Sequence, residues 1–251
     1  MIEFKNVKLC FGETQIIEDL SFSIKKGEFF CVLGPSGCGK STTLRLIGDL
    51  LKNYSGKITI SGKPPSECWQ QMAYVFQNPR LLPWKNTLDN AAFGLEMRHP
   101  NISKERRNEI ALKQLIKVGL ASDIKKMPLM LSGGERQRVS LARALALEPE
   151  IILMDEPFSA LDPNTRRLLR SQLVQLWQDI GMTIIFVTHD IDEALELGDR
   201  IIVLGTRPSK VEKIITPKEN RPRYIDICEE LRDTKKELIL LFEKLAITKA
   251  N

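Results

Sequence analysis

Gly34-Pro-Ser-Gly-Cys-Gly-Lys-Ser41, followed by Thr42, forms a glycine-rich segment with a lysine near its end. It matches the pattern G-x-x-x-x-G-K-[ST], in which glycines let the backbone turn its N–H groups inward onto phosphate oxygens. The apolar run Glu28–Leu33 before it predicts a buried strand, and the spacing of apolar residues after it predicts a helix over Ser41–Leu51. A strand, a glycine loop and a helix in this order predict a site for a nucleoside triphosphate with magnesium.

Each residue type in this loop suits phosphate. The start of the helix contributes about half a unit of positive charge. Lys40 has the length to reach the β- and γ-phosphates, and the Ser41 hydroxyl is a ligand for Mg²⁺. We assign nucleotide binding to the whole loop: Gly34, Pro35, Ser36, Gly37, Cys38, Gly39, Lys40, Ser41 and Thr42. For Cys38 a small filler role is the plain interpretation, and an oxidation switch near the helix start is the alternative.

Composition and charge narrow the class of protein. The 251 residues are 43% hydrophobic and 27% charged, with a formal net charge of +5. The length and the hydrophobic fraction are ample for one large domain or two small ones. The basic residues are dispersed, which argues against a nucleic-acid partner. The alternating residues Met1–Leu9 do not predict a signal peptide, and no apolar run is long enough to span a membrane. Five cysteines without C-x-x-C spacing fit a reducing cytosol rather than disulfides or a metal site.

The order of predicted elements is that of an α/β fold. Strands fill residues 1–33 and recur at Gly56–Ile60 and Met72–Phe76, and residues 86–147 read as a helical insert. Strands and helices then alternate, which predicts a parallel sheet covered by helices. The predicted later elements are Ile151–Met154, Asn164–Ile180, Met182–Val187, Ile191–Leu197, Arg200–Leu204, Val211–Ile215 and a last helix to about Ile247. Its Leu238, Leu241 and Leu245 share a face, which packs on its own domain or binds a partner.

We therefore expect a single domain over residues 1–251. Residues 1–85 and 148–220 would form the core, with an N-terminal antiparallel β part; residues 86–147 would form the helical insert, and residues 221–251 the C-terminal helix.

Two carboxylates end the apolar strand Ile151–Met154. A strand of this kind beside a phosphate loop brings Asp155 to the Mg²⁺ shell. Glu156 is expected to point the other way and to act as the base that polarises the attacking water. The alternative is that both acids merely cap a strand.

A second anion site is predicted at Leu131-Ser-Gly-Gly-Glu-Arg-Gln-Arg138. Ser132, Gly133 and Gly134 at a helix start present free N–H groups, a hydroxyl and the positive helix end. One triphosphate does not need two such sites from one chain, so we expect a site shared between two subunits. An ordinary Ser-capped helix, the alternative, explains Ser132 but not both glycines.

Six ordered motifs resemble those of the ATP-binding cassette (ABC) ATPases: Gly34–Thr42, Gln77, Leu131–Glu135, Ile151–Glu156, Ser159–Asp162 and Thr188–Asp190. The resemblance implies a head-to-tail dimer with two ATP molecules, each between Gly34–Thr42 of one copy and Ser132–Gly134 of the other. It implies that Phe11 stacks on adenine, that Gln77 senses Mg²⁺ and the attacking water, that Asp162 bridges subunits and that His189 holds the γ-phosphate. Glu135 and Phe11 stand where the family often has Gln and Tyr, and we expect them to tune turnover.

The stretch Gln77–Asn90 is similar to ATPase subunits of importers for nitrate, sulfonates and taurine, and so are Arg207–Ser209 and Pro217–Arg223. The resemblance implies a peripheral ATPase on the cytoplasmic face of the membrane. Its partners would be integral permease subunits, a second copy of itself and, indirectly, an external substrate-binding protein. Leu81, Leu82 and Trp84 would face the permease, or else cover the domain's own core. The alternatives are a soluble ABC ATPase of nucleic-acid repair or translation, and a signalling nucleotide switch; the single cassette without sustained heptads argues against the first.

Overall fold

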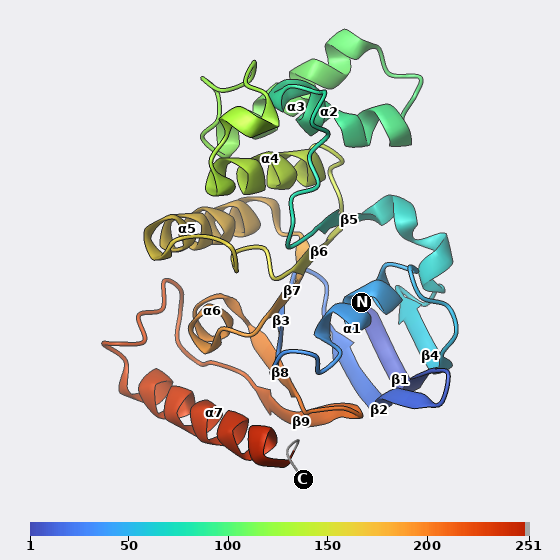
Figure 1. The fold of residues 1–251 in the computed structure, drawn as a ribbon, viewed down its shortest axis with the longest axis vertical. Coiled ribbons are helices and arrows are strands. Elements are labelled where there is room, and N and C mark those ends of the chain that lie inside the picture. Colours follow the sequence, from blue (N-terminus) through green and yellow to red (C-terminus); the bar gives the residue numbers. More distant parts are fainter. Residues whose placement is uncertain (249–251) are drawn as a thin grey trace. The chain divides into compact units, whose positions relative to one another are not determined.

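The computed structural model describes residues 1–248 and divides into two compact units (Figure 1). The first unit contains Met1–Trp69 and Gly181–Asn251, and the second contains Gln70–Ile180. The last three residues of the predicted C-terminal segment 221–251 lie outside the described residues. In residues 1–248 no helix has the length and apolar character needed to cross a membrane.

The first unit contains a mixed sheet of strand order β4-β1-β2-β9-β8-β3-β7. Strand β1 pairs in antiparallel with β2 and β4, whereas β3 pairs in parallel with β7 and β8, so the predicted α/β class with an N-terminal antiparallel part is confirmed. The strands are β1 Ile2–Phe11, β2 Thr14–Ile24, β3 Phe29–Leu33, β4 Ser55–Ile60, β7 Thr183–Thr188, β8 Arg200–Leu204 and β9 Ser209–Ile215. Strand β9 joins the two parts, since it runs parallel to β2 and antiparallel to β8.

Helices cover both faces of the parallel strands in the first unit. Helix α1 (Lys40–Ile47) lies on one side of β3 and β7, and helix α6 (Ile191–Leu197) lies on the other (Figure 1). Helix α7 (Glu229–Thr248) contacts α6. Leu238 and Leu245 of α7 are buried and Leu241 is half-buried, so this stripe packs on its own unit, the first of the two interpretations.

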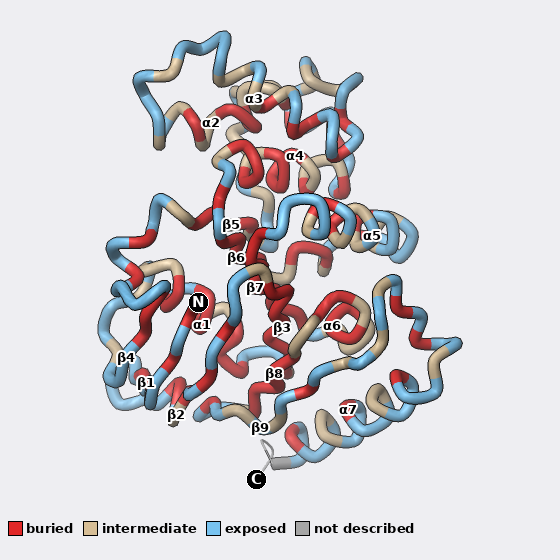
Figure 2. The backbone as a smooth tube through the Cα atoms, turned by 180° about the vertical axis from the view of Figure 1, so that it is seen from behind, coloured by how far each residue is buried: buried red, intermediate tan, exposed pale blue. Residues whose placement is uncertain are grey.

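Aromatic side chains fill the core of the first unit. Phe4 stacks on Phe22 with ring centroids 4.4 Å apart, and Phe22 stacks on Phe30 at 5.6 Å. Phe29 and Phe186 are also fully buried, and β3, β7 and β8 are buried almost throughout (Figure 2). Burying one such side chain contributes about 1.5–3 kcal/mol to the free energy of folding. The buried strands therefore hold the loops at their ends in fixed positions.

The helix predicted over Ser41–Leu51 is too long. Helix α1 ends at Ile47, and its cap Gly48 donates its N–H to Leu44 O and Leu46 O. Asp49 follows with a left-handed φ of +55°, and Leu50 N bonds back to Arg45 O at 2.8 Å. A residue in this conformation ends a helix, and Asp tolerates it better than most side chains, so the apolar spacing at Leu51 was misleading.

The second unit combines a parallel strand pair with four helices. Strand β5 (Met72–Val75) pairs in parallel with β6 (Ile151–Asp155). Helices α2, α3 and α4 pack on one another. The helices are α2 Thr87–Arg98, α3 Lys104–Lys117, α4 Gly133–Leu145 and α5 Pro163–Ile180, and a short 3₁₀ turn lies at Pro128–Met130. Two further 3₁₀ turns lie at Pro65–Glu67, in the first unit, and at Trp69–Gln71, where the chain passes from the first unit to the second. Ser103 caps α3, accepting from Arg106 N at 3.2 Å.

Candidate nucleotide site

The candidate residues fall into two groups, one in each unit. The first unit holds Phe11, the loop Gly34–Thr42 and His189, and the second unit holds Gln77, Asp155, Glu156, Ser132–Glu135 and Asp162.

The loop between β3 and α1 has the conformation that phosphate binding needs. Gly37 and Gly39 have φ of +80° and +98°, which only glycine adopts without strain. A Cβ on Gly34 would lie 2.7 Å from Cys38 Sγ and 2.8 Å from Leu204 O, so the backbone approaches its surroundings too closely for a side chain. The Cys38 thiol is 1% exposed, which fits the filler role.

Lys40 lies over this loop. Its ammonium group donates to Gly34 O at 2.8 Å and to Pro35 O at 3.0 Å, and the residue is 4% exposed. Loop carbonyls therefore hold the buried cation at the start of α1. An anion reaching the loop would meet a fixed charge in a partly dry setting, where electrostatic attraction is stronger than in water.

Ser209, at the start of β9, is hydrogen-bonded to the backbone of this loop. Its hydroxyl donates a hydrogen bond to the carbonyl oxygen of Cys38, and Ser209 is fully buried. A Cβ on Gly39 would lie 2.8 Å from this hydroxyl. Because the carbonyl and the next N–H of a peptide point in opposite directions, this bond directs the Gly39 N–H away from Ser209.

His189 lies in a tightly bonded turn between β7 and α6. Thr188 Oγ1 donates to Glu193 Oε2 at 2.6 Å and accepts from Asp190 N at 3.0 Å. Asp190 Oδ1 caps α6 by accepting from the N–H groups of Asp192 and Glu193. The backbone on both sides of His189 is therefore fixed.

The two acids of the second unit differ in backbone geometry. Asp155 is the last residue of β6, whereas Glu156 lies just beyond the strand with a left-handed φ of +43°. Ser159 Oγ donates to Glu156 O at 3.0 Å, and Gln77 Nε2 donates to Ser159 Oγ at 3.1 Å. A non-glycine residue at positive φ costs about 1–3 kcal/mol and persists where surrounding bonds hold it. The structure thus links Gln77 to Glu156 through Ser159.

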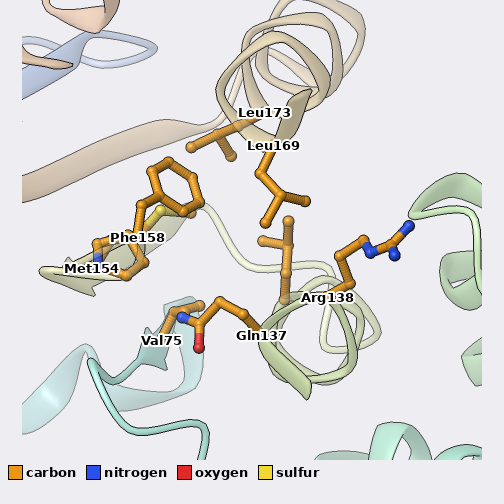
Figure 3. A pocket seen from close by; sticks show the side chains of 9 residues that line it. Val75, Gln137, Arg138, Met154, Phe158, Leu169 and Leu173 are labelled. Carbon is orange, nitrogen blue, oxygen red and sulfur yellow. The ribbon is translucent and has the colours of Figure 1, made fainter. Parts of the chain in front are cut away.

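Phe158 anchors the turn after Glu156. It lies in a small apolar pocket with Met154 of β6, Leu169 and Leu173 of α5 and, from α4, Gln137 (Figure 3). Gln137 Nε2 also donates to Phe76 O, the carbonyl just before Gln77, at 3.2 Å. The helix that begins at the predicted second anion site is therefore bonded to the strand end that carries Gln77.

A capping box opens α4. Ser132 Oγ accepts from Glu135 N at 3.2 Å, and Glu135 Oε2 accepts from Ser132 N at 2.6 Å. The Ser132 backbone N–H lowers the pKa of the Glu135 carboxyl, with a smaller effect from the Ser132 side chain. Glu135, which differs from the family's common Gln, thus has a structural role at this helix start.

The two glycines of α4 have different surroundings. A Cβ on Gly134 would lie 2.5 Å from Thr165 Cγ2 of α5, so close helix packing accounts for this glycine. A Cβ on Gly133 would meet only Leu161 Cδ2, at 3.8 Å, and Gly133 is exposed. The expectation that a capped helix leaves both glycines unexplained is therefore wrong for Gly134. Asp162 lies close by, exposed, and accepts from Thr165 N at 3.0 Å.

Comparison with known proteins agrees with these motifs. The sequence profile of the ABC transporter family matches residues 17–159, more than half of the chain. The chain belongs to the ABC transporter family. It is 42% identical over 93% of its length to an uncharacterized ABC transporter ATP-binding protein of Methanocaldococcus jannaschii, covering 87% of that protein. It is 42% identical to a taurine import ATP-binding protein of Escherichia coli O157:H7 (84% and 82% covered) and 40% identical to a nitrate import ATP-binding protein of Synechococcus elongatus (84% and 78%).

A solved structure extends the likeness to the fold of this ABC ATPase. A dimeric ATP-binding cassette in a post-hydrolysis state with ADP and Pi superposes with a TM-score of 0.77 at 34% identity. The match covers 88% of this chain and all of that one. The chain is accordingly an ATP-binding, ATP-hydrolysing cassette.

Side chains of α2 and α4 form hydrogen bonds to the backbone of the loop after Gln77 in this ABC ATPase. Asn90 accepts from Leu82 N at 2.7 Å and donates to Lys85 O at 2.7 Å, and Arg143 donates to Pro79 O at 2.7 Å. Trp84 is nevertheless 71% exposed, so it does not cover its own core; Leu81 and Leu82 are half-buried.

Magnesium fits the donor set of the ABC ATPase. Within residues 1–248 no three His, Cys, Asp or Glu side chains form a metal cluster. Mg²⁺ in nucleotide sites takes only one or two protein oxygens and otherwise phosphates and waters. The predicted ligands Ser41, Gln77 and Asp155 offer a hydroxyl, an amide oxygen and a carboxylate, all hard oxygens.

Sequence reasoning missed three supporting side chains: Ser159, Ser209 and Arg223. Each lies in a stretch that the motifs had singled out, 159–162 or 207–223, but no periodicity reveals which hydroxyl or guanidinium turns inward. Ser209 and Arg223 are buried polar residues, whereas Ser159 is only half-buried, so no single sequence signal points to all three.

Proposed function

We propose that this ABC ATPase energises a membrane importer for a small solute of the taurine, sulfonate or nitrate class. The observation that carries the ATPase chemistry is the buried Lys40 ammonium, held at 2.8 Å and 3.0 Å by carbonyls of a glycine loop. The names of the taurine and nitrate import relatives support the importer.

The ATPase works as a head-to-tail dimer. ATP lies between Gly34–Thr42 of one copy and Ser132–Gly134 of the other, with Phe11 on the adenine. Support comes from the exposed start of α4 and from the dimeric solved cassette. Phe11 is 50% exposed at the end of β1, which leaves its ring face open to a base. Asp162, exposed beside the same helix start, contacts the partner copy.

The roles within each site follow from charge and geometry. Glu156 is the general base for the attacking water, and Gln77 orients that water. Lys40 and His189 stabilise the charge on the γ-phosphate. Mg²⁺, held by Ser41, Asp155 and Gln77, neutralises the phosphates when bound. Hydrogen bonds connect Gln77 to Ser159 and Ser159 to the Glu156 carbonyl. This connection supports the proposal that Gln77 and Glu156 act on the same water molecule.

Residues 78–84 bind the permease at the cytoplasmic face of the membrane. An indole that is 71% exposed on a loop fixed by Asn90 and Arg143 is a rigid apolar anchor of the kind found at interface centres. The solute itself reaches the permease through an external binding protein and does not contact this chain.

Uptake tests the function as a whole. Cells lacking this protein are restored with wild type, Lys40→Ala or Trp84→Ala and are offered labelled taurine, an alkanesulfonate and nitrate. We expect uptake of one solute to require Lys40 and to fall with Trp84→Ala, while ATP hydrolysis by purified Trp84→Ala stays normal. If uptake of every solute is the same with Lys40→Ala as with wild type, the proposed importer function is contradicted.

A further inference from the structure

Arg223 is a buried cation that the nucleotide site does not use. It is 8% exposed, and burial lowers the pKa of its guanidinium from the usual range. Nε donates to Glu219 O at 2.8 Å, and Nη1 donates to Leu195 O at 3.1 Å and to Gly198 O at 2.5 Å. Two of these three carbonyls belong to the C-terminal end of α6.

Arg221 reinforces the same end of α6. Its Nη1 donates to Asp199 Oδ1 at 2.6 Å, and its Nη2 donates to Leu197 O. Asp199 Oδ2 in turn accepts from Phe29 N, at the start of β3, at 2.9 Å. The last carbonyls of a helix have no partner within the helix and carry partial negative charge, so two guanidinium groups suit this position.

The opposite end of α6 carries His189. Asp190 caps the helix, and the bond from Thr188 to Glu193 at 2.6 Å fixes the turn that precedes it. The helix has only seven residues, about 10 Å of length. A shift of its C-terminal end therefore moves its N-terminal end as well.

We propose that Arg223, assisted by Arg221, is a positioning residue that holds α6 so that His189 faces the nucleotide. The proposal rests on the proposed role of His189 at the γ-phosphate. Arg223 itself donates hydrogen bonds to three backbone carbonyls. Its effect on hydrolysis passes through the helix.

The two histidines of the chain, His99 and His189, give a direct readout. With ¹³C-labelled histidine the imidazole spectrum contains two signals, and His189→Ala assigns them. We expect Arg223→Met to shift or broaden the His189 signal and to leave His99 unchanged. Arg98→Met is the matched control: Arg98 also donates to two carbonyls, Gln70 O at 2.8 Å and Met72 O at 2.7 Å, and both acceptors belong to the second unit, whereas α6 belongs to the first.

Arg223→Lys covers the case in which the Met variant does not fold. An ammonium keeps the charge but cannot reproduce the planar fork, so the His189 signal should shift in the same direction by less. An unchanged His189 signal in a folded Arg223 variant would overturn the proposal, as would an equal shift in Arg98→Met.

Kinetics separate this proposal from the function on which it rests. A displacement of about 1 Å can cost up to a hundredfold in rate, so we expect kcat of Arg223→Met to fall about tenfold with little change in KM. In a His189→Ala background the same substitution should have no further effect. An additive loss would overturn positioning through His189. Normal hydrolysis by His189→Ala would instead refute the role of His189, while the spectra still test the positioning.

Discussion

Gln77 donates its side-chain amide to the hydroxyl of Ser159 at 3.1 Å, and this bond joins the end of β5 to the turn after β6. The same hydroxyl donates to Glu156 O at 3.0 Å. One small side chain thus bridges the proposed sensor and the residue that carries the proposed base. Since Glu156 has a φ of +43°, the bond to its carbonyl helps to hold an unfavourable backbone conformation.

Ser159→Ala removes the bridge. A hydrogen bond of this kind contributes about 1 kcal/mol, which corresponds to a roughly fivefold lower kcat, with KM for ATP little changed. Steady-state hydrolysis measures both constants, and the exposed Ser122→Ala serves as the control. Unaltered kcat in a folded Ser159→Ala protein would contradict the role of the bridge.

Ser209→Ala removes the hydroxyl beneath the phosphate loop. Without the bond to Cys38 O, the Gly39 peptide loses its fixed orientation, and we expect ATP to bind about fivefold more weakly for a loss near 1 kcal/mol. Calorimetric titration with a slowly hydrolysed ATP analogue measures the affinity. Lys210→Ala, an exposed neighbour, should retain wild-type binding. Equal ATP affinities for wild type, Ser209→Ala and Lys210→Ala would show that the Ser209 hydroxyl does not support the phosphate loop.

Gly134→Ala forces α4 away from α5. The new Cβ would lie 2.5 Å from Thr165 Cγ2, so we expect a loss of about 1–3 kcal/mol in unfolding free energy. Thr165→Ser deletes that methyl group, and the double variant should recover most of the loss. Chemical denaturation of the four proteins gives the coupling energy, and the absence of recovery would show that the glycine has another purpose.

Glu135→Ala breaks the capping box, whereas Glu135→Gln preserves an acceptor for Ser132 N. We expect Ala to cost about 0.5–2 kcal/mol and Gln much less. Because folding lowers the pKa of Glu135, its stabilisation is complete above the unfolded pKa of about 4.3 and fades as pH falls through the lower folded value. Thermal unfolding across pH 3–7 should therefore show wild type and Glu135→Ala converging at acidic pH. A difference in stability between the two proteins that stays constant from pH 3 to pH 7 would show that the ionised Glu135 carboxylate is not its source.

Much of this architecture was predictable from sequence because its signals are local. A glycine loop between an apolar strand and a helix leaves few options, and α6 and β8 begin and end as predicted, at Ile191–Leu197 and Arg200–Leu204.

The features that sequence patterns missed depend on contacts between distant segments. The end of α1 depends on the left-handed Asp49, which apolar spacing does not encode. The role of Gly134 depends on Thr165, and the pairing of β9 with both β2 and β8 depends on two other strands. The role of Arg223 depends on three carbonyl partners, which no local pattern around Arg223 reveals.

The substitution Glu156→Gln tests whether two copies of the chain share each ATP. This substitution keeps the shape of the side chain but removes the base, so it should slow hydrolysis by about 10²–10⁴-fold and trap ATP. Size exclusion with light scattering should show a dimer with ATP and Mg²⁺ and a monomer without nucleotide, and Lys40→Ala in the same background should stay monomeric. A Glu156→Gln protein that binds ATP yet remains a monomer would contradict the shared site.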